Sequence, residues 1–222
     1  MARRWGDAMF RDRQGAGEQL VPLLRALGLE QPIVYALLRG GAAVAAPIAA
    51  ALGAPLEPFL VRKLGVPWHA ELAFGALAEG ATEPVLNPDI VAACGLTQTD
   101  MARVQAEQAR ELARRQAIYL RGRERPDPRG RAAILVDDGL ATGASARAAL
   151  RALRAQGATP LVLAVPVAPR ESIDAISSEA DRVVCAEVSD IPFGIGGCYG
   201  DFHQLEDEEV LALLAAGGKA GP

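Results

Sequence analysis

The sequence predicts an α/β fold with a central parallel β-sheet flanked by helices. Short apolar runs, each long enough for one buried strand, alternate along the chain with longer Ala-, Leu- and Arg-rich segments that favour helix. Strands that alternate with helices form parallel sheets, because each return to the same edge needs a crossover. Three of the apolar runs also end in charged or glycine-rich loops, and the carboxyl ends of parallel strands are where such folds bind ligands.

Length, charge and cysteine usage narrow the class of protein. At 222 residues, the chain has the length of one domain, so we expect a single domain over residues 1–222. The net charge of −4 does not favour binding to nucleic acid or to a membrane surface. The cysteines are odd in number and widely spaced, which fits no disulfide framework and predicts a cytoplasmic protein. The charged N-terminus and the short apolar stretch 44–52 predict neither a signal peptide nor a membrane span.

The first part of the chain contains two alternations of helix and strand. We expect a helix at 17–27, a strand at 33–38, a helix at 42–52 and a strand at 56–61. The first of these strands ends at LLRGG and the second at VRK. Gly and Pro interrupt the next segment, so we expect a mobile loop over 64–80 and a hairpin with the arms FGALAEG and EPVLN.

The rest of the chain repeats the pattern after a long helix and a charged linker. We expect helices at 97–121, 144–155, 171–179 and 207–215, and strands at 132–136, 161–167 and 182–186. The glycine-rich stretch 187–204 is predicted to be irregular. We therefore expect a core over about residues 30–187 and a small hood built from about 1–28 and 188–222.

The stretch RAAILVDDGLATGASARAAL joins a buried strand, two acids, a small-residue loop and a helix. Asp137 and Asp138 end the apolar run, because two adjacent like charges belong at a wet strand end rather than in a dry core. Free N–H groups at the start of the following helix can bind phosphate, and small side chains let it approach. Gly139 and Gly143 lack the spacing of a Walker A loop, Ala144 stands where its Lys would be, and GxGxxG is missing. These departures argue against an ATPase or a dehydrogenase.

The segment ILVDDGLATGAS closely resembles the phosphoribosyl-pyrophosphate motif of type I phosphoribosyltransferases. The resemblance implies that Asp137 and Asp138 bind the ribose hydroxyls and contribute to catalysis. It implies that Gly139 also belongs to the PRPP-binding loop and that the 5-phosphate is bound by the following residues, Leu140, Ala141, Thr142, Gly143, Ala144 and Ser145. The family's 6-oxopurine enzymes carry an acid where Ala141 stands, so proton transfer to a purine by that route is disfavoured. The alternative interpretation is an ordinary strand–turn–helix with a solvated acidic pair.

Two further strand ends carry groups suited to anions. In LLRGG, Arg39 is a donor, and Gly40 and Gly41 permit close approach. Beside the acidic motif, this turn resembles the family's pyrophosphate loop, although many relatives have Pro at position 38. VRKLGVP resembles the entry to the family's flexible loop, which implies that Arg62 and the catalytic Lys63 neutralise the pyrophosphate leaving group. Two solvated charges at a strand end are the alternative interpretation.

The tail IPFGIGGCYGDFHQLEDEEV resembles the hood that covers the base in this family. Phe193, Ile195 and Tyr199 offer apolar faces to an aromatic ring, although packing of the same side chains under the loop is the alternative. Asp201 lies near the place of a metal-contacting acid in 6-oxopurine enzymes, but the spacing differs by one residue. The N-terminal segment MFRDRQGAGEQL is expected to pack against this hood.

The resemblance implies a phosphoribosyltransferase that uses 5-phosphoribosyl-1-pyrophosphate (PRPP) and Mg²⁺, transfers phosphoribose to a nitrogenous base, and releases pyrophosphate. Asp137 and Asp138 are candidate contacts to the ion through the ribose or water, and no direct metal ligand is predicted. The expected partners are these small molecules, without nucleic acid or membrane; a homodimer is left open. A regulator that binds PRPP or a nucleotide without turnover is the second hypothesis, and an unrelated α/β binding module is the third. The sequence does not name the base.

Overall fold

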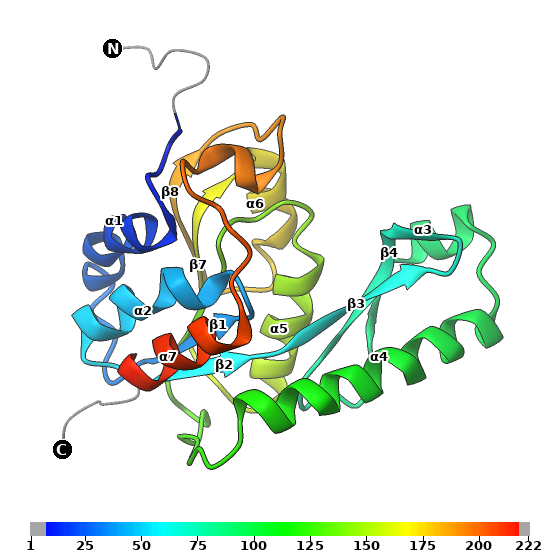
Figure 1. Ribbon diagram of the computed structural model, residues 1–222, viewed down its shortest axis with the longest axis horizontal. Coiled ribbons are helices and arrows are strands. Elements are labelled where there is room, and N and C mark those ends of the chain that lie inside the picture. The colour runs from blue at the N-terminus through cyan, green and yellow to red at the C-terminus, as the bar shows by residue number, and fades with distance from the viewer. Residues whose placement is uncertain (1–7, 218–222) are drawn as a thin grey trace.

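The computed structural model describes residues 8–217, and these residues form a five-stranded parallel sheet with the order β2-β1-β6-β7-β8 (Figure 1). Its strands are β1 Ile33–Leu37, β2 Leu56–Phe59, β6 Ala133–Val136, β7 Leu161–Ala168 and β8 Arg182–Val188. Strands β1 and β6 are neighbours and pair in register from Ile33↔Ala133 to Ala36↔Val136. The predicted α/β class with a central parallel sheet is confirmed.

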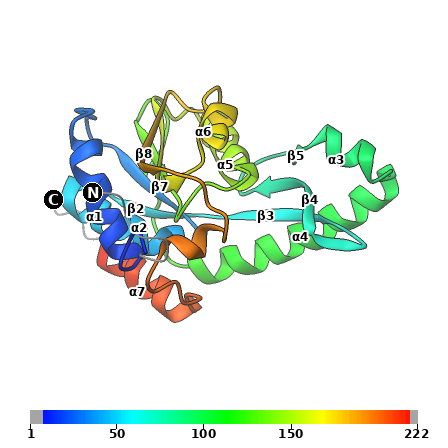
Figure 2. The same ribbon diagram turned by 90° about the horizontal axis from the view of Figure 1, so that it is seen from above.

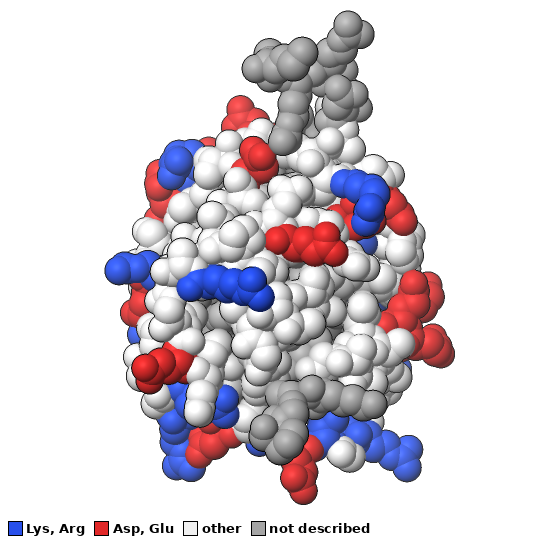
Figure 3. All heavy atoms as spheres, turned by 90° about the vertical axis from the view of Figure 1, so that its left-hand side faces the viewer, with Lys and Arg blue, Asp and Glu red and all other residues white. Residues whose placement is uncertain are grey.

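Helices cover both faces of the sheet. Helices α1 Arg13–Arg25, α2 Gly41–Leu52 and α7 Asp207–Gly217 lie on one side, and α5 Ala144–Ala155 and α6 Arg170–Ile176 lie on the other (Figure 1). Alternate strand residues face each layer: Val34 and Ala36 pack toward α2, whereas Tyr35 and Leu37 pack toward α5. The side of the molecule seen in Figure 3 carries charges of both signs, scattered over a largely uncharged surface. Among the described residues, no helix has the length and apolar character needed to cross a membrane.

An arm extends from this body between β2 and β6 (Figures 1 and 2). It contains the antiparallel strands β3 Val61–Val66, β4 His69–Ala78 and β5 Val85–Leu86, followed by α3 Pro88–Ala93 and α4 Gln98–Tyr119. Helix α4 begins with a capping box, in which the side chains of Thr97 and Asp100 each accept from the other's backbone N–H. It buries Val104, Leu112 and Tyr119 on its inner side.

The arm differs from the sequence-based prediction. The hairpin between FGALAEG and EPVLN is present, since Gly75 pairs with Leu86 and Ala76 with Val85. Residues 64–80, however, are mostly paired strand rather than loop: Gly65 lies at a register shift between β3 and β4, and Pro67 opens the tight turn between them. The predicted strand 56–61 ends at Phe59, and the following residues begin a second sheet. Whether 64–80 moves stays a prediction.

The two segments assigned to the hood divide in the structure. Helices α1 and α7 pack against the sheet and α2, whereas residues 8–12 and 189–206 lie at the carboxyl ends of the strands. We use the name hood below for these two segments. The backbone N–H groups of Met9 and Phe10 donate to the carbonyl of Cys198, so the N-terminal segment packs against the tail as expected. Residues 1–7 and 218–222, which the sequence-based prediction also assigned to the hood, lie outside the described residues.

A buried charge cluster attaches the arm to the sheet. Glu57 on β2 and Glu79 just after β4 are 4% and 2% exposed. Arg125, in the linker after α4, lies 3.4 Å from Glu57 Oε2 through Nε and 2.8 Å from Glu79 Oε1 through a terminal nitrogen. Burial raises the pKa of both glutamates; Arg123 and Arg125 oppose that rise at Glu57, and Arg125 opposes it at Glu79. The cluster thus joins β2, β4 and the linker in one place.

Replacing Arg125 with Met should lower the free energy of unfolding by about 3 kcal/mol, because two buried glutamates lose a shared cation. The loss should be smaller at acid pH. A raised pKa means that the folded state binds protons more readily than the unfolded chain, so stability falls as pH rises through that pKa. Urea unfolding at about pH 5 and about pH 8 measures the difference. The exposed Arg121→Met is the control, and an equal loss at both pH values would contradict the interpretation.

Candidate functional site

The loops after β1 and β6 meet at one edge of the sheet, because the two strands are parallel neighbours in register. Gly40 lies so close to the second acid that an added Cβ would stand 1.9 Å from Asp138 Oδ2. A Cβ on Gly41 would stand 2.4 Å from the carbonyl oxygen of Val136. Only glycine permits this approach at either position. The structure therefore brings LLRGG and the acidic motif together, although about a hundred residues separate them.

The two acids occupy unequal surroundings. Asp137 Oδ1 accepts a hydrogen bond from the backbone N–H of Asp138 at 2.9 Å. Burial, and then the neighbouring Asp138, raise the pKa of Asp137 well above its ordinary value. Burial also raises the pKa of Asp138, but Arg13 opposes that rise. The pair is therefore costly to keep ionised and favours a ligand that brings hydroxyl donors or a cation.

The acidic pair also provides the chemistry that Mg²⁺ prefers, which is hard oxygen donors with room for water and ligand oxygens. The residues described here contain no group of three or more His, Cys, Asp or Glu side chains that could hold a metal ion. Asp137 and Asp138 are therefore the carboxylates of this site that would contact such an ion.

The loop after the acids leads into α5. Leu140 is buried, and its N–H donates to the carbonyl of Val167, which fixes the loop on the neighbouring strand. Gly143 has φ 73°, a left-handed conformation that glycine adopts readily, and directly precedes α5. Ala141 and Thr142 are exposed. The first turn of α5 presents its N–H groups beside them, as an anion site requires.

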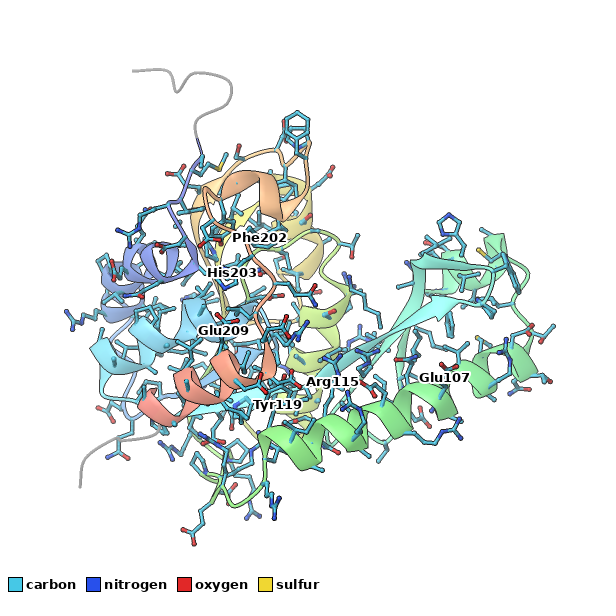
Figure 4. All side chains as sticks on the ribbon, viewed as in Figure 1. Glu107, Arg115, Tyr119, Phe202, His203 and Glu209 are labelled. Carbon is cyan, nitrogen blue, oxygen red and sulfur yellow. The ribbon has the colours of Figure 1, made fainter. Side chains whose placement is uncertain are left out.

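Arg39 has a long contact with the C-terminal helix α7. The peptide bond before it is cis. Its guanidinium lies 3.4 Å from Asp207 Oδ1, which also accepts from the hydroxyl of Tyr119 at 2.5 Å. The hydrogen bond from Tyr119, and then the charge of Arg39, hold the pKa of Asp207 below its ordinary value. Figure 4 shows Tyr119 at the body end of α4, so this bond joins the arm to α7.

The structure separates the two basic residues of VRK. Arg62 and Lys63 are consecutive in β3 and therefore point to opposite faces. Arg62 donates through Nε and a terminal nitrogen to Gln108 Oε1 on α4, at 2.9 and 2.8 Å. Lys63 instead lines a cavity of about 650 Å³ together with Thr142, which lies in the loop between the two acids and α5. Its charge also acts on Asp137. Lys63 therefore faces this cavity beside the start of α5, whereas the guanidinium of Arg62 is bound on the arm helix.

The three hood residues proposed to contact a base differ in their burial and contacts. The hydroxyl of Tyr199 donates to the backbone carbonyl of Asp138 at 2.6 Å, and its ring packs between Phe10 and Phe202. Ile195 lies against Gly139. Phe193 is 80% exposed. Tyr199 and Ile195 thus pack on Asp138 and Gly139, whereas the side chain of Phe193 is exposed to solvent.

Asp201 does not join the acidic pair. It is exposed, and its carboxylate accepts from the backbone N–H of His203 and lies 3.1 Å from that imidazole. Glu209 lies 3.1 Å from the other ring nitrogen, and Figure 4 shows His203 on the segment that leads into α7 and Glu209 in the first turn of that helix. The two carboxylates raise the pKa of His203.

Arg13 was missed by the sequence analysis. Its Nε donates to Asp138 Oδ2 at 2.9 Å, and its guanidinium stacks on the ring of Phe202, 3.7 Å from the centroid. A signal was present in the sequence, because Arg13 shares the spacing of Ala16, Leu20 and Leu24 on the buried face of α1. A buried arginine requires an acidic partner.

Comparisons with known proteins agree with this architecture. The family described as "Phosphoribosyl transferase domain" matches residues 14–202. A Mycobacterium tuberculosis protein named as a candidate phosphoribosyl transferase is 44% identical over 206 residues, which cover 93% of this chain and 46% of that protein. The crystal structure of TT1426 from Thermus thermophilus is 41% identical with a TM-score of 0.78, and the match covers 92% of this chain and 97% of that chain.

The chain therefore belongs to the phosphoribosyl transferase family, and the predicted family membership is confirmed. It spans about half the length of the Mycobacterium protein that it matches, 46%.

The contact between the motif and the hood can be tested without a ligand. Gly139→Ala should destabilise the protein by about 1–3 kcal/mol, because its Cβ would stand 2.6 Å from Ile195 Cδ1. Adding Ile195→Ala should remove the clash, so the double variant should melt close to Ile195→Ala alone. Thermal melts of the four proteins measure this. Additive losses in the double variant would show that Ile195 is not what the new methyl group meets.

Proposed function

We propose that this protein is a phosphoribosyltransferase that binds PRPP with Mg²⁺ and transfers the phosphoribosyl group to a nitrogenous base, with release of pyrophosphate. The observation that carries the proposal is the convergence at neighbouring strand ends. The acids Asp137 and Asp138, the loop glycine Gly40 and the start of α5 all lie at the same edge of the sheet. Family membership supports it, since the match covers both loops.

In the proposed complex, each part of PRPP lies at a different group of residues. The ribose hydroxyls donate to Asp137 and Asp138, which are ionised once a ligand supplies donors. The 5-phosphate accepts from the N–H groups at the start of α5, next to Thr142. The pyrophosphate lies at the loop of Arg39, Gly40 and Gly41. Arg39 is only weakly held by Asp207, at 3.4 Å, so it can turn to the ligand.

In the reaction, the bond between the anomeric carbon and pyrophosphate breaks, and its electron pair leaves with the pyrophosphate. The ring carbon gains positive charge until the nitrogen of the base attacks it. Mg²⁺ supplies charge neutralisation on the pyrophosphate when bound. Asp137 and Asp138 place negative charge near the cationic carbon, while Lys63 and Arg39 stabilise the leaving group. Ala141 supplies no acid, so the base receives no proton from that position.

The hood has the features of a cover for the base. Phe193 is exposed beside glycines, and it is the hood aromatic that is free to stack on a ring. Tyr199 and Ile195 contribute indirectly, because they hold the hood on the motif. We do not place Arg62 in the site, because Gln108 holds its guanidinium on the arm helix.

A decisive experiment is pyrophosphate release from PRPP with Mg²⁺ and a panel of purine, pyrimidine and pyridine bases, run beside calorimetric titration with PRPP alone. Release that depends on one base establishes the transferase. Binding of PRPP without release for any base would instead support a regulator that senses PRPP. Failure to bind PRPP at all would reject both.

The double variant Asp137→Asn, Asp138→Asn should fold normally and bind PRPP about a hundredfold more weakly. Each carboxylate is a charge-assisted acceptor for a ribose hydroxyl, and an amide replaces it poorly. The fold should survive because burial raises the pKa of both acids, so their charge does not stabilise the folded state. Titration with Mg²⁺ present, beside a thermal melt, separates the two effects. The exposed Asp190→Asn is the control, and unchanged affinity in the folded double variant would remove the assigned role.

Lys63 and Arg62 form a matched pair for the leaving group. Lys63→Met should lower the rate of pyrophosphate release by about tenfold or more, because its side chain lines the cavity beside Thr142 and its charge acts on Asp137. Arg62→Met should change the rate by about twofold at most, because its side chain binds Gln108 on the opposite face. Steady-state kinetics of the two variants measure this. Equal losses would show that the charge of the arm, rather than the position of Lys63, matters.

A further inference from the structure

Three contacts from outside the motif converge on one part of it. Arg13 donates to the carboxylate of Asp138, and the hydroxyl of Tyr199 donates to its backbone carbonyl at 2.6 Å. Ile195 packs against the next residue, Gly139. The hood and the first residue of α1 therefore both contact the acidic motif.

We infer that Arg13 is a positioning residue for PRPP binding, which fixes the carboxylate of Asp138 so that it can accept from a ribose hydroxyl. The inference rests on the proposed function, because it assigns Arg13 a task in that site. Neither the family resemblance nor the motif pointed to this residue.

The surroundings of Arg13 leave its guanidinium little freedom. The residue is 8% exposed, and one terminal nitrogen donates to the carbonyl of His203 at 2.9 Å. The guanidinium stacks on Phe202 at 3.7 Å from the ring centroid (Figure 4 labels Phe202 and His203). With these two contacts fixed, Nε points at Asp138 Oδ2, 2.9 Å away. A planar, stacked guanidinium provides a rigid donor that a flexible ammonium does not.

The contact leaves part of the acid free for a ligand. Arg13 donates to Oδ2 alone, and a carboxylate has about four acceptor positions on its two oxygens. Oδ2 is also the atom that faces Gly40, so the arginine holds the carboxylate against the pyrophosphate loop. Without Arg13, Asp138 would stand beside Asp137 with no such donor, and repulsion would turn it away or favour its neutral form. Either change removes an acceptor from the ribose site.

The experiment compares the PRPP affinity of wild type, Arg13→Met, Arg13→Lys and Arg11→Met by calorimetry with Mg²⁺, each with a thermal melt. Arg11 is the matched control, because its side chain is 80% exposed and pairs with Asp12. Arg13→Met should weaken binding by about tenfold or more, Arg13→Lys should fall between it and wild type, and Arg11→Met should bind as wild type. In turnover, the loss should fall on the KM for PRPP rather than on kcat.

A double-mutant cycle tells positioning from general support of the fold. If Arg13 acts through Asp138, then Arg13→Met should cost little further affinity when Asp138→Asn is already present. The inference would be overturned if the losses of affinity in the two single variants added fully in the double variant. It would also be overturned if folded Arg13→Met bound PRPP as tightly as wild type, or more tightly. If Arg13→Met does not fold, Arg13→Lys and Phe202→Leu decide in the same way, because the latter loosens the guanidinium without removing its charge. If neither wild type nor Arg11→Met binds PRPP, the proposed function is overturned, and this inference with it. If all variants bind PRPP equally, only this inference is overturned.

Discussion

The close approach of two loops is the constraint on which the rest of the site depends. Gly40 touches the carboxylate of Asp138 because β1 and β6 are parallel, adjacent and in register. A side chain at position 40 would move either the acid or the loop. That single contact places a candidate pyrophosphate loop beside a candidate ribose site. The start of α5 follows within a few residues on the same edge, because the crossover after β6 must begin there.

The same arrangement places two carboxylates where they are costly to ionise, and the structure offsets this in several ways. Arg13 donates to Asp138, and Lys63 contributes positive charge near Asp137. The hood adds neutral support, because the Tyr199 hydroxyl satisfies the carbonyl of Asp138. Asp137 receives only a backbone N–H among its described hydrogen bonds. Asp137 therefore has no cation in direct contact among its described hydrogen bonds, and such a buried carboxylate favours a ligand that brings hydroxyl donors or a divalent cation.

Sequence patterns predicted the sheet and the convergence of its loops, but not the side chains that complete the site. Apolar runs and glycine loops are local signals, and parallel pairing then brings their ends together without further information. The contacts of Arg13 with Asp138 and of Arg39 with Asp207 join residues 125 and 168 positions apart, and no local pattern encodes such pairs. Residues 64–80 of the arm were predicted as a loop for another reason. Gly65 and Pro67 are typical of loops, yet here they make a register shift and a tight turn within a paired ribbon.

The arm matters to the site because it carries Lys63, and its anchoring sets where that ammonium lies. At its base, Arg125 joins β2 and β4 through Glu57 and Glu79. Helix α4 has its own link to the site, because Tyr119 bonds Asp207 and Asp207 in turn contacts Arg39. The two cations proposed for the leaving group are therefore Lys63 on β3 and Arg39 after β1, and the contacts of Arg125 and Tyr119 connect the arm to the body. A shift of the arm would move Lys63 directly, and it would reach Arg39 through Asp207. The contacts of Arg125 and Tyr119 thus fix the place of the arm relative to the sheet and to α7, and with it the place of Lys63.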